Sequence, residues 1–293
     1  MTNDGASMLG RTCVVTGATS GLGAVTARVL AERGAEVVVV GRAPERCEAT
    51  VRQIKLQTAS RTVSWMRCDL SSQREVRDLA QEYRSRHQRL DVLVNNAGAV
   101  FGTRRLSTDG IEMTFATNHL SQFLLTNLLL DSLKASAAAR VVNVSSIAHE
   151  QAHIDFDDIE CRRAYRPMQV YGKSKLANLY FTYELARRLE GTSVTVNALH
   201  PGLVRTNFGP RAGPLGRIVQ TLVHLRYRRY SIGAEEGAAT IVFLATSPAV
   251  DGVTGKYFVD ERAVSSAEQS YDQSAARKLW EVSAAMSGLS TTA

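Results

Sequence analysis

The stretch VYGKSKLANLY places a tyrosine and a lysine four residues apart at the start of a segment with helical apolar periodicity. Positions i and i+4 of a helix lie on one face, so Tyr171 and Lys175 can act on one small site, whereas Lys173 points away. An ammonium beside a phenol stabilises the phenolate and lowers the pKa of the tyrosine from about 10, which would make it a general acid/base. Taken alone the pair is common, and a surface lysine beside a half-buried tyrosine is the simpler interpretation.

A glycine-rich segment near the start of the chain indicates a site for a dinucleotide. The sequence TGATSGLG follows the apolar stretch at 11–16 and opens a helical segment at 23–33. Gly17 permits a tight turn, and Gly21 and Gly23 let the backbone and the helix N-terminus approach a pyrophosphate, which the helix dipole favours. The glycine pattern alone is weak, but its place between a strand and a helix strengthens the prediction.

The end of the second apolar stretch, at 35–41, carries an arginine where binders of the unphosphorylated dinucleotide usually carry an acid. Such an acid grips the ribose 2′-hydroxyl, and no Asp or Glu stands at residues 41–44. Arg42, with Arg46 one turn further on, suits a 2′-phosphate instead, because a guanidinium makes charge-assisted contacts with phosphate. The sequence therefore predicts NADP(H) as the cofactor, and a solvated loop arginine is the alternative.

Strand-like and helix-like segments alternate along the chain and predict the elements that position these residues. Near-continuous runs of valine, isoleucine and leucine are typical of parallel strands covered on both faces. We therefore expect an α/β fold, a single-domain Rossmann-type doubly wound parallel sheet of about seven strands with helices on both faces, over residues 1–293. The core is expected at about 10–260, followed by a tail at about 261–293 with weak periodicity and partial mobility. The predicted strands are 11–16, 35–41, 62–68, 90–96, 140–146, 193–199 and 255–259, and the predicted helices are about 23–33, 44–58, 72–87, 108–133, 171–190 and 234–245.

Composition and charge limit the classes of function. Of 293 residues, 44% are hydrophobic and 22% are charged, which is ordinary for a soluble globular protein. The net charge of +7 comes from 35 basic and 28 acidic residues, and the basic residues are scattered without a long run or interleaved aromatic residues. This distribution weighs against nucleic-acid binding and fits a mild attraction for a phosphorylated cofactor.

The spacing of the cysteines and the length of the apolar runs indicate where in the cell the protein is expected. The four cysteines show no C-x-x-C spacing, which favours free thiols in a reducing cytoplasm. The N-terminal stretch MTNDGASMLGR lacks the apolar core of a signal peptide, and no apolar run approaches the ~20 residues of a membrane span. We therefore expect a cytoplasmic protein without a membrane span. The basic, amphipathic segment at 215–230 is expected to be a lid or a core-packing helix, and contact with a membrane surface is the alternative.

Seven short motifs occur in the order found in one large enzyme family. They are TGATSGLG (16–23), CDL (68–70), NNAG (95–98), TNHL (117–120), VVNVSS (141–146), YGKSK (171–175) and HPG (200–202). With these motifs, over roughly residues 10–260, the chain resembles the short-chain dehydrogenase/reductase family. The resemblance implies an NADP(H)-dependent enzyme that interconverts a carbonyl and an alcohol.

The resemblance also implies a role for each residue of the catalytic set. Tyr171 is the acid/base, Ser146 polarises the substrate oxygen, and Lys175 keeps the tyrosine acidic and grips the nicotinamide ribose. Asn118 holds a water in a proton relay that includes the lysine. Adjacent strand residues face opposite sides of a sheet, so only one of Ser145 and Ser146 can point into the site, and the resemblance selects the second.

The resemblance further implies which residues surround the cofactor. Asp69 contacts the adenine, and Asn95, Ala97 and Gly98 line the cofactor or brace the central strands. Pro201, Gly202 and Thr206 lie near the nicotinamide. No metal ligand is expected. Together with the glycine-rich loop and the arginine, the expected cofactor-binding residues are Gly17, Thr19, Ser20, Gly21, Leu22, Gly23, Arg42, Asp69, Leu70, Asn95, Ala97, Gly98, Tyr171, Lys175, Pro201, Gly202, Val204 and Thr206.

Within the family, the stretches TNHLSQFLLTNLLL, KLANLYFTYELARRL and VNALHPGLVRTN look most like the retinol-dehydrogenase-like branch. So does the long gap of 25 residues between Ser146 and Tyr171. This similarity implies a small lipophilic carbonyl or alcohol substrate and a homodimer or homotetramer. A ketoreductase that tailors a polyketide or other polycyclic metabolite is the alternative enzyme. A non-catalytic dinucleotide-binding regulator is the alternative of another class, and it would not need the acid/base residues.

One competing motif is HEQAH at 149–153, which matches the H-E-x-x-H signature of zinc peptidases. That chemistry needs two histidines on one face of a helix and a third ligand. Here the motif begins three residues after Ser146, at the exit of a strand, and no clear third ligand follows. We therefore interpret the two histidines as loop residues over the substrate pocket.

Overall fold

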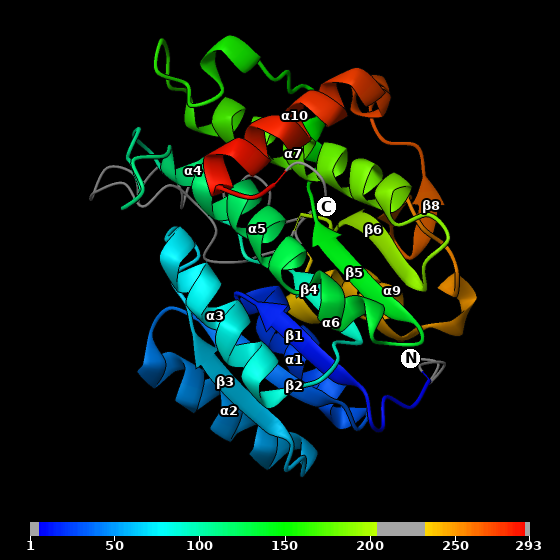
Figure 1. Cartoon of the computed structure of the whole chain (residues 1–293). Coiled ribbons are helices and arrows are strands. Elements are labelled where there is room, and N and C mark those ends of the chain that lie inside the picture. Colours follow the sequence, from blue (N-terminus) through cyan, green and yellow to red (C-terminus); the bar gives the residue numbers. More distant parts are fainter. Residues whose placement is uncertain (1–5, 204–231, 291–293) are drawn as a thin grey trace.

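The computed structural model describes residues 6–203 and 232–290, and a twisted sheet with helices on both faces forms its centre (Figure 1). Within the described residues the sheet has eight strands in the order β3-β2-β1-β4-β5-β6-β7-β8. Neighbouring strands are parallel except for the last pair, β7 and β8, which is antiparallel. The strands are β1 Thr12–Thr16, β2 Glu36–Gly41, β3 Val63–Arg67, β4 Val92–Asn95, β5 Ala139–Val144, β6 Val194–His200, β7 Tyr257–Val259 and β8 Arg262–Val264.

Helices cover both faces of the sheet, and each face has its own hydrophobic core. Helices α1, α2 and α9 cover one face, α3, α5 and α7 cover the other, and α10 packs outside α7 (Figure 1). The helices are α1 Gly21–Glu32, α2 Pro44–Thr58, α3 Gln73–Arg86, α4 Met113–Phe115, α5 Ser121–Leu128, α6 Leu130–Lys134, α7 Pro167–Arg188, α9 Ala234–Thr246 and α10 Gln273–Ser287. A π-helical turn, Ala116–Leu120, joins α4 to α5.

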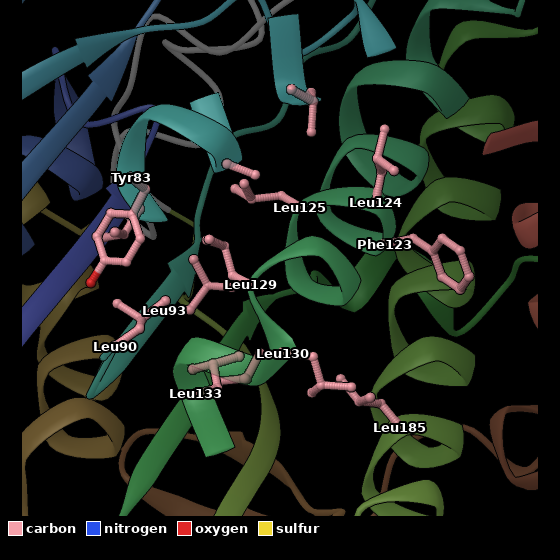
Figure 2. Close-up of a cluster of buried hydrophobic side chains, with 14 of the residues drawn as sticks. Tyr83, Leu90, Leu93, Phe123, Leu124, Leu125, Leu129, Leu130, Leu133 and Leu185 are labelled. Carbon is pink, nitrogen blue, oxygen red and sulfur yellow. The ribbon is translucent and has the colours of Figure 1, made fainter. Parts of the chain in front are cut away.

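Strand residues alternate between the two cores, which explains why the strands read as unbroken apolar runs. Val14 and Val40 face the core that contains Phe123 and Tyr83, shown in Figure 2, whereas Val15 packs into the opposite core. Both faces of β1 and β2 are therefore buried, as the Val-rich sequence predicts for parallel strands. The predicted doubly wound parallel sheet is confirmed, with one additional antiparallel strand, β8.

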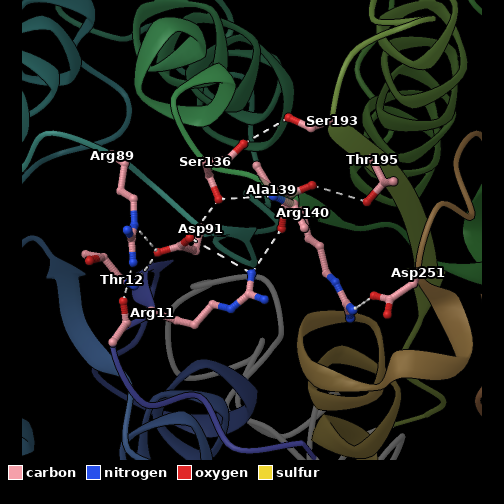
Figure 3. Close-up of polar contacts among 12 residues, drawn as sticks. Arg11, Thr12, Arg89, Asp91, Ser136, Ala139, Arg140, Ser193, Thr195 and Asp251 are labelled. Carbon is pink, nitrogen blue, oxygen red and sulfur yellow. Dashed lines mark hydrogen bonds and ion pairs between the residues drawn. The ribbon is translucent and has the colours of Figure 1, made fainter.

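The amino-terminal ends of the central strands are held together by a buried carboxylate. Asp91, just before β4, accepts hydrogen bonds from the main-chain nitrogen of Thr12 at 2.8 Å and from the hydroxyl of Ser136 at 2.7 Å (Figure 3). The Arg89 guanidinium lies 3.2 Å from the same side chain. This network fixes β1 and β4 at the edge opposite the glycine-rich loop, so the carboxyl edge is built on a rigid base.

The structure corrects the predicted tail at 261–293. Part of it forms β8, and residues 273–287 form α10, which is capped at its start by Asp272 and ends at Gly288 with φ of 60°. The buried positions of α10 recur at helical spacing, but alanine and serine occupy most of them, so the apolar periodicity of the sequence is weak. The large exceptions are Leu279 and Trp280, and the tryptophan is buried against α5 and α7.

Other predicted boundaries also change, and α7 begins at Pro167 rather than at the predicted residue 171. The predicted helix at 108–133 begins only at Met113 and is broken by the π-helical turn and by Leu129, so it consists of α4, α5 and α6. The predicted strand at 140–146 ends at Val144, which puts Ser145 and Ser146 beyond β5. Over the described ranges, no helix has the length and apolar character needed to cross a membrane. The segment at 215–230 lies outside those ranges.

Candidate active site

The carboxyl ends of β1, β4, β5 and β6 meet at one edge of the sheet, and the predicted site residues follow these ends. The glycine-rich loop follows β1, residues 96–98 follow β4, Ser146 follows β5 and Pro201 follows β6. In an open α/β sheet this edge is where ligands bind. Helix α7 packs beside β5 and β6 and carries Tyr171 to the same place.

Tyr171 and Ser146 are hydrogen-bonded through their side chains, and the tyrosine is buried. Ser146 has extended backbone angles and precedes a 3-10 helix, Ile147–His149, whose Ala148 nitrogen donates to the serine hydroxyl at 3.3 Å. The hydroxyl of Ser145 instead donates to the main-chain oxygen of Lys175 at 2.9 Å. Of the two serines, therefore, the second faces the tyrosine.

Lys175 lies on the same face of α7 as the tyrosine. Its Nζ is 5.6 Å from the centre of the Tyr171 ring and donates to the main-chain oxygen of Val144 at 2.8 Å. Lys173 points elsewhere, with Nζ 3.5 Å from Sγ of Cys161, as helical spacing predicts. Burial lowers the pKa of Lys175 to about 8.

The prediction that the pKa of Tyr171 is lowered is wrong for the protein chain without a bound cofactor. Burial raises the pKa of Tyr171 to about 12, and the hydrogen bond with Ser146 opposes this rise only in part. The sequence expectation considered the nearby ammonium and left out the cost of an anion in a dry site, which raises the pKa of any acid. Tyr171 is therefore protonated at neutral pH.

Asn118 lies in the π-helical turn, and its side chain ties this turn to the loop after β4. Nδ2 donates to the main-chain oxygen of Ala99 at 2.9 Å and to Oγ of Ser174 at 3.0 Å, while Oδ1 accepts from the nitrogen of Ala99 at 2.8 Å. A Cβ atom added to Gly98 would lie 3.4 Å from the Lys175 ammonium and 3.7 Å from Oδ1 of Asn118. The four predicted catalytic residues therefore gather around one point, and single π-helical turns are frequent at functional sites.

The glycine-rich loop is compressed against the end of β4. Gly17 has φ of 65°, and a Cβ atom on Gly23 would lie 2.6 Å from the main-chain oxygen of Gly17 and 2.5 Å from Nδ2 of Asn96. Asn96 fixes the turn, because Nδ2 donates to the main-chain oxygen of Thr16 at 2.8 Å. Sequence analysis missed the role of Asn96, although the residue stands inside the NNAG motif.

The start of α1 fits a bound anion. Ser20 occupies the N-cap position, but its side chain makes no capping hydrogen bond. Gly21, with φ of 56°, has no side chain to cover the first turn. The N–H groups at the start of a 12-residue helix are therefore not satisfied by a capping side chain, and the helix dipole favours negative charge there.

Two guanidinium groups follow β2, one just after the strand and one in the first turn of α2. Arg46 donates to the main-chain oxygen of Thr19 at 3.3 Å. Arg42 is 60% exposed, and its Nη1 lies 3.8 Å from Oδ2 of Asp69. A Cβ atom on Gly41 would lie 2.5 Å from the Thr19 side chain, so the close approach of the loop to β2 requires glycine.

Two buried polar atoms lie between the glycine-rich loop and Leu70. Oδ1 of Asn95 and Nε2 of Gln122 have no hydrogen-bond partner among the described residues, and both side chains line a small pocket with Leu70 and Ala97. The amide nitrogen of Asn95 is used, since it donates to Oδ1 of Asn143 at 2.9 Å and so braces β4 against β5. The pocket has no room for a water molecule, so these two atoms are not placed to bind a ligand.

The last predicted cofactor residues follow β6. Gly202 has φ of 80°, and a Cβ atom there would lie 2.6 Å from the Ile232 side chain, so glycine is required. Pro201 begins this turn at the edge of the site. Val204 and Thr206 lie outside the described residues.

The first histidine of the HEQAH motif, His149, cannot bind a metal because both of its ring nitrogens are already used in contacts. His149 is buried, and both ring nitrogens contact main-chain atoms of other residues. His153 is exposed. In the part of the chain that the structure describes, no group of three His, Cys, Asp or Glu side chains is placed to hold a metal.

Comparison with known proteins agrees with this geometry. The sequence pattern of the family described as short chain dehydrogenase matches residues 11–213. Human retinol dehydrogenase 14 is 44% identical over 295 residues, which is 96% of this chain and 88% of that protein. A crystal structure of a protein from Mycobacterium paratuberculosis has a TM-score of 0.80 at 34% identity, covering 99% of this chain and 98% of that one. An NADP active-site complex of Pseudomonas aeruginosa RhlG has a TM-score of 0.69 at 29% identity, covering 86% and 95%.

The family pattern spans more than half of the 293 residues, and the human relative covers nearly all of them. This chain combines the observed strand order with a compressed glycine-rich loop and a buried Tyr171 that contacts Ser146. The chain belongs to the short-chain dehydrogenase/reductase family and is an oxidoreductase that acts on alcohol or carbonyl groups.

Proposed function

We propose that the protein is an NADP(H)-dependent oxidoreductase that interconverts a carbonyl and an alcohol on a lipophilic substrate. The observation that carries this proposal is the contact between Ser146 and a buried, protonated Tyr171, with the Lys175 ammonium 5.6 Å from the ring. The nicotinamide, when bound, supplies or accepts the hydride. The protein must then handle one proton and one developing negative charge on oxygen.

In the reducing direction, the hydroxyl of Ser146 donates to the substrate oxygen and Tyr171 delivers the proton. Lys175 adds positive charge beside the tyrosine, which favours the phenolate left after proton transfer. The Asn118 amide is occupied by Ala99 and Ser174, so we assign the relay water to a main-chain atom of the π-helical turn rather than to this side chain. A regulator without turnover would need none of these residues.

The proposed cofactor preference rests on charge at the end of β2. Arg46 contacts Thr19 of the glycine-rich loop, Arg42 lies beside Asp69, and no acid follows Gly41 at the next three positions. Asp69 partly balances Arg42, but the 3.8 Å distance and the exposure of the guanidinium leave it free to turn towards a phosphate. The NADP complex of RhlG supports the same preference by similarity.

The proposed substrate class rests on apolar side chains that stay exposed around the site. Ile147 directly follows Ser146, Met168 precedes Tyr171 by three residues, and Leu203 follows Gly202; they are 48%, 60% and 50% exposed. Large exposed apolar groups near a site are typical of surfaces that bind apolar ligands. The similarity to retinol dehydrogenase 14 supports a lipophilic alcohol or aldehyde. A cytoplasmic location and a homo-oligomeric state stay predictions from the sequence.

A substrate and cofactor screen tests the proposal. The panel contains retinaldehyde, a long-chain prenyl aldehyde, a polycyclic ketone, a ketoacyl thioester and a small sugar, each with NADPH and NADH. We expect the highest kcat/KM for an apolar aldehyde with NADPH, followed at the absorbance band of the reduced nicotinamide. Highest efficiency on the ketone or thioester would favour the ketoreductase alternative. No turnover on any compound, with tight cofactor binding, would favour the regulator.

A further inference from the structure

One buried side chain beside the serine has no part in the chemistry above. His149 ends the 3-10 helix that begins after Ser146, and its imidazole is buried. Nδ1 lies 2.7 Å from the main-chain oxygen of Ser146, and Nε2 lies 3.1 Å from the main-chain nitrogen of Ala267. The ring therefore connects the serine to a segment 118 residues further along the chain.

These two contacts determine the tautomer of the imidazole. The N–H of Ala267 can only donate, so Nε2 must accept; the carbonyl of Ser146 can only accept, so Nδ1 must carry the proton. A protonated ring would place a second N–H against that of Ala267. Burial lowers the pKa of His149, which keeps the ring neutral at neutral pH. The titratable groups that face the ring are Glu150, His200 and Tyr257.

The hydrogen bond from the ring acts on the backbone of the serine. The carbonyl of Ser146 accepts twice from His149, from the main-chain nitrogen at 3.1 Å and from Nδ1 at 2.7 Å. Two donors fix the peptide plane at the point where the chain leaves β5, and with it the direction in which the serine side chain points. A displacement of about 1 Å in a reacting group can cost about 100-fold in rate, so this fixing has catalytic consequences.

The segment on the other side of the ring is itself firmly held. Nε2 of Gln269 donates to three main-chain oxygens between residues 149 and 152, at 2.9–3.3 Å. The hydroxyl of Tyr180 donates to the main-chain oxygen of Gln269 at 3.0 Å. Tyr180 and Tyr171 are both on α7, so this C-terminal segment contacts the serine loop and the tyrosine helix together.

We propose that His149 is a positioning residue for the oxidoreductase reaction. This inference rests on the proposed function. As a neutral imidazole protonated at Nδ1, it holds Ser146 in register with Tyr171. Through Ala267 it makes the C-terminal segment a support of the active site. It acts through the serine and transfers no proton itself.

The kinetic test compares three variants. His149→Phe keeps an aromatic ring but removes both hydrogen bonds, and His149→Asn keeps a donor near the Ser146 carbonyl. His87→Phe is the matched control, because His87 lies beside Glu36 at the start of β2, at the edge of the sheet opposite the site. We expect kcat to fall about 10- to 100-fold in His149→Phe, to recover in part in His149→Asn and to stay unchanged in His87→Phe, with equal NADPH dissociation constants. A lower unfolding midpoint with unchanged kcat per folded enzyme would overturn the proposal.

A second measurement does not depend on turnover. In ¹⁵N-labelled wild type, the imidazole signals of His149 should show a protonated Nδ1 and an unprotonated Nε2 from pH 8 to pH 6. The opposite tautomer, or an imidazolium at pH 7, would overturn the proposal. If the wild type reduces no compound of the panel, the proposed function fails, while the tautomer still decides whether the ring makes both contacts.

Discussion

At the scale of single residues, the two adjacent serines offer a direct comparison. Ser146 contacts the Tyr171 side chain, whereas Ser145 is buried against the main-chain oxygen of Lys175. We expect Ser146→Ala to lower kcat for carbonyl reduction about 100-fold, because it removes a donor to the developing oxyanion. Ser145→Ala should cost about 1 kcal/mol of unfolding free energy and less than about tenfold in kcat. Steady-state kinetics and urea unfolding of both variants check this, and the reverse order of kcat losses would contradict it.

Lys175 predicts a pH dependence of the reduction rate. Burial lowers the pKa of its ammonium to about 8, and a lysine is charged below its pKa and neutral above it. The rate of carbonyl reduction should therefore hold below pH 8 and fall above it, as the positive charge beside Tyr171 is lost. Initial rates at saturating NADPH between pH 6 and pH 10 measure this. Lys173→Met, which changes the lysine on the other face of α7, should keep the same profile.

The pH profile can be assigned by a conservative change. In Lys175→Arg the guanidinium stays protonated over the whole range. The decrease near pH 8 should then disappear, although the overall rate is lower because the longer side chain no longer fits against the Val144 carbonyl. A decrease that persists at the same pH in this variant would belong to another group.

Arg42 predicts the choice between the two cofactors. Its guanidinium is exposed beside Asp69, and a charge-assisted contact with the 2′-phosphate is worth about 1.5–3 kcal/mol. Wild type should therefore bind NADPH about 10- to 100-fold more tightly than NADH, and Arg42→Ala should lose most of this ratio. Fluorescence titrations with both cofactors measure it. Arg52→Ala, on the exposed side of α2, serves as the control, and tighter binding of NADH by wild type would contradict the assignment.

At the scale of elements, one aromatic side chain packs α10 against two other helices. Trp280 is buried, with ring centres 4.9 Å from Phe123 and 6.0 Å from Phe181, and the Arg188 guanidinium lies 4.1 Å from its ring centre. Trp280→Ala should lower the free energy of unfolding by about 3–5 kcal/mol, because it leaves a cavity between three helices. Urea unfolding measures the loss. Glu281→Ala, an exposed neighbour on the same helix, should change the midpoint little, and equal losses would mean that α10 is not anchored through its tryptophan.

Sequence patterns predicted the elements that are formed by long apolar runs. They did not predict elements whose buried residues are small or whose form depends on main-chain hydrogen bonding. The seven parallel strands follow from residues such as Val37–Val40, which both cores bury. Helix α10 was missed because four of its six buried residues are alanine or serine, and small residues give little hydrophobic contrast. The π-helical turn before α5 arises from a change in main-chain hydrogen bonding, in which the N–H of Ser121 donates to the main-chain oxygen of Ala116. No residue type in the sequence predicts this change.

The candidate site was predictable to a similar extent. The spacing that unites Tyr171 with Lys175 and separates Lys173 follows from helix geometry alone, and the structure agrees. The raised pKa of the tyrosine depends on burial, which a sequence does not give. His149 was predicted to cover the substrate pocket, but its contacts depend on Ala267, whose distance along the chain hides the pairing.

At the scale of the whole molecule, buried histidines predict how stability changes with pH. Burial lowers the pKa of His119 to about 3 and of His200 to about 4, and it also lowers the pKa of His149. In the unfolded chain each returns to about 6.5. As pH falls below 6.5, these histidines bind protons in the unfolded state but not in the folded state, so the free energy of unfolding must decrease.

Urea unfolding midpoints at pH 7.5 and pH 5 measure this decrease. His119→Asn should reduce the difference between the two midpoints, because it removes one of the three groups. His153→Asn should leave the difference unchanged, since His153 is exposed in the folded protein. Equal midpoints at both pH values in wild type would contradict the expectation.

The contacts of the C-terminal segment also set an order of events during synthesis. Translation delivers the glycine-rich loop, Ser146 and Tyr171 well before Ala267 and α10, and domains begin to fold from the N-terminal side as they emerge. A nascent chain can therefore form the dinucleotide-binding half while Nε2 of His149 still lacks its donor. Under the proposed role of His149, the serine is aligned only when Ala267 has left the ribosome. A chain that stops before this residue would keep every residue predicted to react and lose the contact that holds Ser146 in place.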